Sequence, residues 1–193
     1  MIKYDNEIKN SLFKRYFGKK ERLIKAYNAI AGSDLPITAK INITTHEKNL
    51  YFSESDYITF TLNDRFIVLI NNRTIINEDI PTKLLIFIAD IYKNIIIGSY
   101  SNMIKTKSLP APEFFVIYTG REKYPDKKVL RLSDAFNTNA VRLNLDLFVT
   151  VYNITKGHNV ELLSQCSVLS DYAVLVSLVY EGIDEGKTHG ADI

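Results

Sequence analysis

A polar cluster, Asn71, Asn72 and Arg73, directly follows residues 66–70, an apolar run typical of a buried central strand. The amide of Asn71 is a far weaker ligand for Mg²⁺ than a carboxylate, and Arg73, whose pKa exceeds about 12, cannot deprotonate a water molecule. A guanidinium can instead bind a phosphate or a carboxylate. The cluster could therefore bind an anion, or it simply ends the strand and begins a polar loop.

Few other residues have the types and spacing of a reactive site. The sequence has no phosphate-cradling glycine loop, no metal-binding cysteine pair and no HExxH motif. His158 precedes an expected helix and could act as a base or a ligand, although a capping or packing role is the alternative that we favour. Cys166 has no evident base nearby and is interpreted as a structural thiol. Ser133 and Asp134 suit a turn or a helix cap.

Basic residues gather near the N-terminus and could bind phosphates or an acidic protein, or form a solvated helix face. Only Glu21 opposes them between residues 9 and 25. The candidate binding residues in this stretch are Lys14, Arg15, Lys19, Lys20 and Arg22.

The elements that must position these residues begin with two helices within residues 7–31, which Gly18 separates and Gly32 ends. Alternation over residues 58–62 predicts a strand, a tight turn at Asn63-Asp64 joins it to the strand over residues 66–71, and the two strands are expected to pair antiparallel. Pro81 suits the first turn of a following helix.

The second half of the chain is predicted to add two strands, an edge element and two helices. Pro110 and Pro112 are expected to exclude regular structure before Glu113, and the strand "FFVIYTG" follows them. The stretch "LRLSDAF" predicts a short edge element, and "LNLDLFVTVYNI" another strand. Asn159 is expected to cap a short helix, and Ser170 the last one. This order predicts one α/β or α+β domain over residues 1–182, a mixed sheet flanked by helices, followed by a flexible tail at 183–193.

Composition limits the class of protein. The 193 residues are 46% hydrophobic and 24% charged, with a formal net charge of +2 and a single cysteine. These values are typical of a globular protein, and the charge makes no general demand for nucleic acid. The sequence shows no secretory signal and no membrane-spanning apolar stretch, and we expect a cytoplasmic location.

Several stretches, covering about residues 12–180, resemble the recombination-promoting nuclease and transposase family of bacteria. That family belongs to the PD-(D/E)XK nuclease superfamily. The stretches, in chain order, are "FKRYFG", "PTKLLIFIADIY", "LPAPEFFVIYTG", "LRLSDAF" and "NITKGHNVELLSQCSVLSDYAVLV".

The resemblance implies a restriction-endonuclease-like core in which an Asp on one strand and a Glu on the next hold Mg²⁺. A Lys or Gln two positions after the Glu orients the attacking water. Counting back from Pro81 places the Glu on Asn71 and the Lys or Gln on Arg73, and the Asp falls on Tyr57. None of the three has the required side chain. Asp56 and Asp64 are the fallback carboxylates, and the resemblance also implies a shortened C-terminus.

Three interpretations follow as expectations, of which the third is a pseudogene product with no selected role. The first is a catalytically degenerate nuclease fold that needs no cofactor and binds a macromolecule, with a protein favoured and DNA an alternative. Such a protein could be an inhibitor encoded by a mobile element or phage. The second is an active Mg²⁺-dependent DNA endonuclease with an unorthodox site. Arg73 favours the first, because a guanidinium can bind an anion but occupies the place of a metal.

Overall fold

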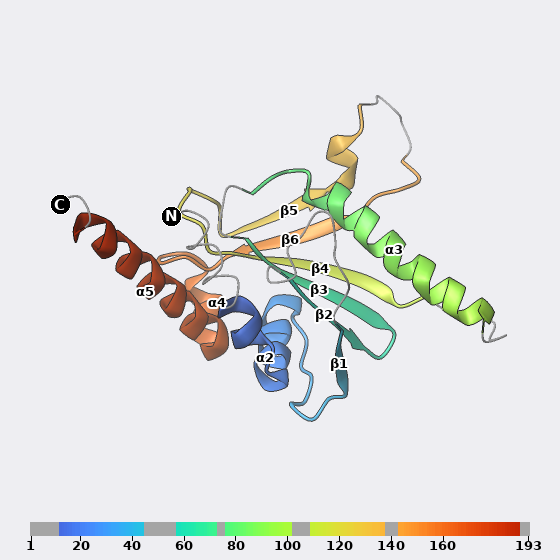
Figure 1. Ribbon diagram of the computed structural model, residues 1–193, viewed down its shortest axis with the longest axis horizontal. Helices are drawn as coiled ribbons and strands as arrows, with labels where there is room; N and C mark the ends of the chain where they lie inside the picture. The colour runs from blue at the N-terminus through green and yellow to red at the C-terminus, as the bar shows by residue number, and fades with distance from the viewer. Residues whose placement is uncertain (1–11, 45–56, 73–75, 102–108, 138–142, 190–193) are drawn as a thin grey trace.

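The computed structural model describes residues 12–44, 57–72, 76–101, 109–137 and 143–189, and it is a six-stranded mixed sheet flanked by helices (Figure 1). Residues 12–17 are helical and precede α2. The remaining elements are α2 (Lys20–Ala31), β1 (Ile41–Thr44), β2 (Tyr57–Leu62), β3 (Arg65–Asn72), α3 (Ile80–Ser101), β4 (Ala111–Tyr118), β5 (Lys127–Arg131), a 3₁₀ turn (Leu132–Ala135), β6 (Phe148–Asn153), α4 (Val160–Gln165) and α5 (Ser167–His189).

The strand order is β1-β2-β3-β4-β6-β5, and the three central strands β3, β4 and β6 run parallel. The predicted hairpin is confirmed, because β2 and β3 pair antiparallel around a turn in which Asn63 has a φ of 51°. The register places Tyr57 opposite Ile70 and Leu62 opposite Arg65. Helix α3 connects β3 to its parallel neighbour β4, and the edge strand β5 is antiparallel to β6.

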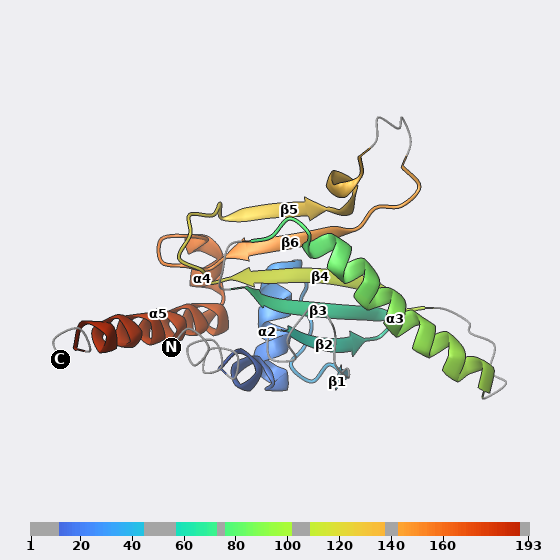
Figure 2. The same cartoon turned by 45° about the horizontal axis from the view of Figure 1, so that its top comes forward.

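The sheet separates two apolar layers. In Figure 2, α3 crosses one face of the strands and α2 lies behind the other. Strand β3 turns Ile67 and Leu69 toward the helices α2, α4 and α5, and it turns Phe66, Val68 and Ile70 toward α3. Residues on one strand alternate between the faces. The prediction of a central strand that is apolar on both faces is therefore confirmed.

An aromatic cluster fixes the N-terminal helical residues to α5. The ring centroid of Tyr172, which is fully buried, lies 4.9 Å from that of Phe17, 5.3 Å from that of Tyr16 and 6.0 Å from that of Phe13. The hydroxyl of Tyr16 also donates a hydrogen bond to the carbonyl oxygen of Val168 at 3.0 Å. The cluster holds the basic N-terminal segment against the last helix.

Some predicted boundaries were wrong. Pro112 lies inside β4, opposite Phe66 of β3. The register of β4 with β6 begins only at Phe115, so Pro112 occupies an unpaired edge, where a proline is tolerated. Helix α5 begins at Ser167, so Ser170 is not its cap, and the helix ends at His189, beyond the boundary at residue 182 that we expected.

Within the described residues, no helix is both long enough and apolar enough to cross a lipid bilayer.

Candidate functional site at the carboxyl ends of the parallel strands

A polar side chain lies at the carboxyl end of each of the three parallel strands, at the same edge of the sheet. Asn71 lies at the end of β3, Thr119 directly after β4 and Asn153 at the end of β6, and each is at most 4% exposed. In open α/β sheets, ligands bind outside the carboxyl ends of the strands. This polar edge is therefore the first candidate site.

Asn71 and Thr119 form a neutral pair at the polar edge. The Thr119 hydroxyl donates a long hydrogen bond, 3.4 Å, to Oδ1 of Asn71. The Asn71 amide nitrogen is buried without a hydrogen-bond partner among the described residues. The position that the resemblance assigns to a metal-binding carboxylate thus holds an uncharged, enclosed amide.

The other predicted metal positions do not converge on this pair. Tyr57 is cross-strand partner to Ile70, so it faces the opposite layer from Asn71, and its ring packs 5.3 Å from that of Phe87 on α3. Asp64 precedes β3 at the other end of the strand, about 23 Å from Asn71 at the usual rise per residue. Arg73 and Asp56 lie outside the described residues.

A cavity of about 460 Å³ opens beside the polar edge, between the loops that follow β4 and β6 and the side of α5. Thr119 lines the cavity and connects it to Asn71. The cations in its lining are Arg121, Lys123 and Lys156, and the carboxylate is that of Glu122. We call this cavity the α5 pocket.

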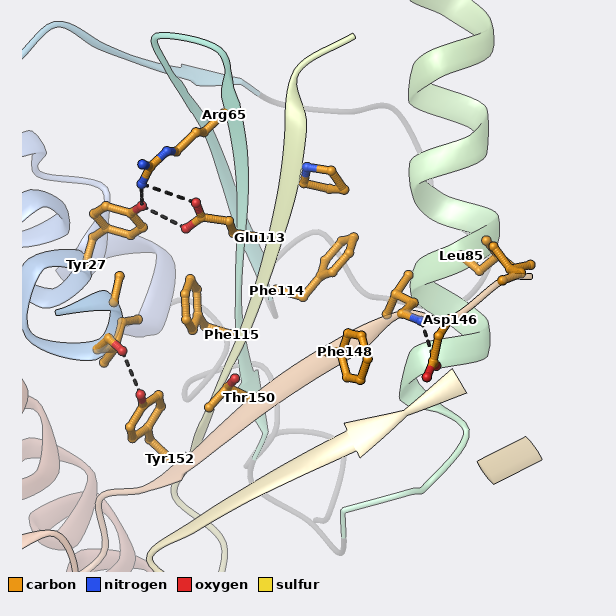
Figure 3. Close-up of a pocket in the computed structure, with 15 residues that line it drawn as sticks. Tyr27, Arg65, Leu85, Glu113, Phe114, Phe115, Asp146, Phe148, Thr150 and Tyr152 are labelled. Atoms are coloured by element: carbon orange, nitrogen blue, oxygen red, sulfur yellow. Dashed lines mark hydrogen bonds and ion pairs between the residues drawn. The ribbon is translucent and has the colours of Figure 1, made fainter. Parts of the chain in front are cut away.

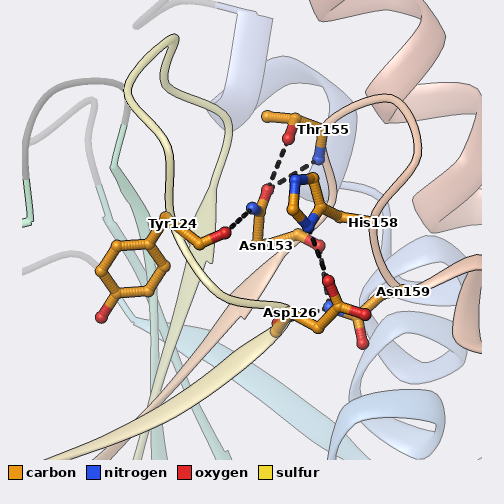
Figure 4. A network of polar contacts seen from close by, with 6 residues as sticks. All are labelled: Tyr124, Asp126, Asn153, Thr155, His158 and Asn159. Atoms are coloured by element: carbon orange, nitrogen blue, oxygen red, sulfur yellow. Dashed lines mark hydrogen bonds and ion pairs between the residues drawn. The ribbon is translucent and has the colours of Figure 1, made fainter.

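One wall of the α5 pocket is held by a polar network that joins the two loops (Figure 4). Nδ1 of His158 lies 2.6 Å from Oδ1 of Asp126, and Nδ2 of Asn159 donates to the carbonyl oxygens of Asp126 and Asn153. The Asn153 amide donates in turn to the carbonyl oxygen of Tyr124. Residues 32 positions apart are thereby fixed against each other.

Hydrogen bonding lowers the pKa of one member of the network, and burial raises the pKa of another. The hydrogen bond from the His158 side chain is the largest cause that lowers the pKa of Asp126, and a bond from the backbone amide of Asn159 adds to it, whereas desolvation raises this pKa. Burial raises the pKa of Tyr124 to about 12. Asp126 is therefore ionised at neutral pH, when it orients His158.

Sequence reasoning found part of this network. His158 is neither a helix cap nor a core residue, because it pairs with a loop carboxylate. Asn159 is the N-cap residue of α4, but its side chain makes no capping bond and bridges the loops instead, with a φ of 45°. The sequence analysis did not identify Asp126, because the composition of a polar loop does not indicate which distant residue it will contact.

The predicted basic residues lie along the N-terminal helical segment and the start of α2. Arg15, Lys19 and Lys20 are exposed, and Lys14 is half-buried. The guanidinium of Arg22 lies 4.1 Å above the ring of Tyr16 and donates to its carbonyl oxygen. Arg22 therefore has a packing role, and the exposed cations form a surface that we call the basic N-terminal surface.

A second cavity, of about 630 Å³, occupies the wedge where β4 and β6 diverge (Figure 3). At one end, Arg65 pairs with Glu113 at 3.3 Å, and the Tyr27 hydroxyl donates to Glu113 at 2.7 Å. Burial, followed by this bond to Glu113, raises the pKa of Tyr27. These polar groups satisfy one another, so the wedge offers mainly apolar surface.

Comparison with known proteins identifies no relative: no family model, no curated protein and no solved structure matches the chain.

Proposed function

We propose that this chain has a nuclease-like fold of the PD-(D/E)XK type, lacks its metal chemistry, and acts by binding an acidic protein partner. The proposal is supported by the mixed sheet, in which an antiparallel β1-β2-β3 meander is followed by a helix and the parallel strand β4. That order agrees with a central mixed sheet flanked by helices, as the resemblance implies.

The observation that carries the proposal is the neutral pair of Asn71 and Thr119. A metal-dependent nuclease needs carboxylates that reach a hydrated cation. Asn71 offers an amide instead, only 4% of the residue is exposed, and its oxygen already accepts a hydrogen bond from Thr119. Restoring a metal site there would require both a charge and an opening of the strand end.

A protein partner is favoured because α5, to which the basic N-terminal segment is fixed, also carries exposed apolar side chains. Val174 and Leu178, one helical turn apart, are each 56% exposed on the helix to which residues 12–17 are fixed. An acidic protein surface with apolar side chains can complement both, whereas a DNA backbone offers only charge. Inhibition of a nuclease or a defence complex by a protein of a mobile element or phage is one role of this kind.

The first test asks whether the chain cleaves DNA. We expect supercoiled plasmid to remain intact after incubation with the pure protein and Mg²⁺ or Mn²⁺, because Asn71 and Thr119 provide no negative charge to hold the cation. Agarose electrophoresis measures this. Nicking that survives repurification and disappears in Asn71→Ala would establish the alternative, an active endonuclease.

The second test concerns the partner. A Lys19→Glu/Lys20→Glu variant should retain at most about a tenth of the partner captured by the wild-type chain from host lysate, because charge complementarity is reversed at two exposed positions. Lys93→Glu, on the exposed side of α3 across the sheet, is the matched control and should capture the full amount.

Fluorescence anisotropy with labelled duplex DNA at low and moderate salt completes this test. Weak binding is expected, because the net charge of the chain is only +2. Tight binding to DNA that falls steeply with salt would replace the protein partner with nucleic acid.

A further inference from the structure

The α5 pocket collects positive charge from two separate loops. Arg121 and Lys123 follow β4, and Lys156 follows β6, whereas Glu122 is the carboxylate in the described lining. The Arg121 guanidinium lies 4.6 Å above the ring of Tyr180 on α5, which holds it at the rim of the cavity. Cations that converge on a concave site favour an anionic ligand.

Hydroxyl side chains extend the same site inward. Thr119, Thr155 and Ser177 line the cavity from β4, from the β6 loop and from α5. Thr119 is 2% exposed, and Thr155 donates both its amide and its hydroxyl to Oδ1 of Asn153, which fixes its position. The hydroxyl protons of Thr119 and Thr155 are already donated to Asn71 and Asn153, so the donors that the lining offers to an anion include the Ser177 hydroxyl and the three loop cations. Donors from several directions suit a tetrahedral oxyanion better than a planar carboxylate, because a phosphate presents three acceptor oxygens.

His158 adds a ring nitrogen of fixed orientation, which donates to an anion when both ring nitrogens carry a proton. Its Nδ1 is engaged by Asp126, so Nε2 is the ring nitrogen left to the lining of the cavity. A histidine that is oriented by a carboxylate presents its second nitrogen in one direction.

The remaining wall of the cavity is apolar, and it favours a ligand that carries an organic group beside its phosphate. Ile154 is fully buried, Val176 is 5% exposed, and both line the cavity together with Ala173 and the ring of Tyr180. A volume of about 460 Å³ exceeds the needs of inorganic phosphate and lies in the range of small-molecule sites. We propose that the α5 pocket binds a small organic phosphate monoester, with the phosphate on the loop cations and the organic group against α5.

The proposal does not depend on the proposed function, because it rests on a different set of side chains from the basic N-terminal surface. A titration followed by calorimetry and by ¹⁵N chemical shifts tests it with three probes: phenyl phosphate, inorganic phosphate and phenol. Phenyl phosphate should bind more tightly than inorganic phosphate, and phenol should not bind. The shifts should be confined to residues 119–123, 154–158 and the pocket side of α5.

The variant Lys123→Gln/Lys156→Gln should weaken phenyl phosphate binding at least about tenfold, because two charge-assisted contacts are lost. Both lysines are exposed, so the variant should keep the wild-type melting temperature. Lys93→Gln, on the other side of the sheet, is the control and should bind as the wild type does. Equal binding of phenol and phenyl phosphate, an unchanged affinity in the double variant, or no binding of phenyl phosphate by the folded wild-type chain would each overturn the proposal.

Discussion

Replacing Tyr172 by alanine should lower the free energy of unfolding by about 3–5 kcal/mol, the usual cost of deleting a buried aromatic ring. Tyr172 is fully buried, and the rings of Phe13, Tyr16 and Phe17 all pack against it. The truncation leaves a cavity that these three side chains cannot fill without moving the N-terminal helical residues. Urea denaturation followed by circular dichroism measures the loss.

Val174→Ala provides the matched control, because Val174 lies on the same helix and is 56% exposed. Its effect should stay within about 0.5 kcal/mol. Native-state hydrogen exchange adds a local readout, since amides of residues 12–17 should exchange faster in Tyr172→Ala and remain unchanged in Val174→Ala. Similar losses in the two variants would contradict the aromatic cluster as the support of the basic N-terminal surface.

Asn159→Gly should cost about 2 kcal/mol more than Asn63→Gly. Both asparagines have a left-handed backbone, with φ values of 45° and 51°, and glycine adopts this conformation without strain. Asn159 loses two hydrogen bonds, to the carbonyl oxygens of Asp126 and Asn153, and each such bond contributes about 1 kcal/mol. In the part of the chain that the structure describes, no side-chain hydrogen bond is found for Asn63.

Both Asn→Gly substitutions raise the entropy of the unfolded chain by the same amount. The difference between their losses of stability therefore measures the contribution of the hydrogen bonds between the loops. Thermal denaturation of both variants at neutral pH measures it. If the two variants lose equal stability, the bonds between the loops contribute nothing, and the wall of the α5 pocket must be held by other contacts.

The sequence predicted the β2–β3 hairpin because its information is local. Ile58, Phe60 and Leu62 alternate with threonines, and Asn63-Asp64 supplies the turn. Local sequence patterns could not predict that β6 lies between β4 and β5, because this order depends on pairing between strands that are distant in the chain. Pro112 was misjudged for the same reason, since only the pairing shows that this part of β4 has a free edge.

The candidate site was predictable to a similar degree. The apolar run before Asn71 located the end of a central strand, but the enclosure of its amide depends on the register of β3 with β4 and on Thr119. The pairing of Asp126 with His158 could not be found from spacing, because the partners come from loops 32 residues apart. A sequence motif can locate a candidate residue in the chain, whereas the burial of its side chain and its hydrogen-bond partners depend on the tertiary fold.

The limited register between β4 and β6 has a consequence for how the native state opens. Their pairing runs only from Phe115–Thr150 to Tyr118–Asn153, whereas β3 and β4 are paired along the whole of β4. Separating β5 and β6 from the rest of the sheet therefore breaks fewer interstrand hydrogen bonds than separating β3 from β4. Structural units with fewer such bonds open at lower free energy than the rest of a protein. We therefore expect the β5–β6 ribbon to open as one cooperative unit, and the α5 pocket, whose walls come from both sides of this seam, to assemble only when that unit is closed.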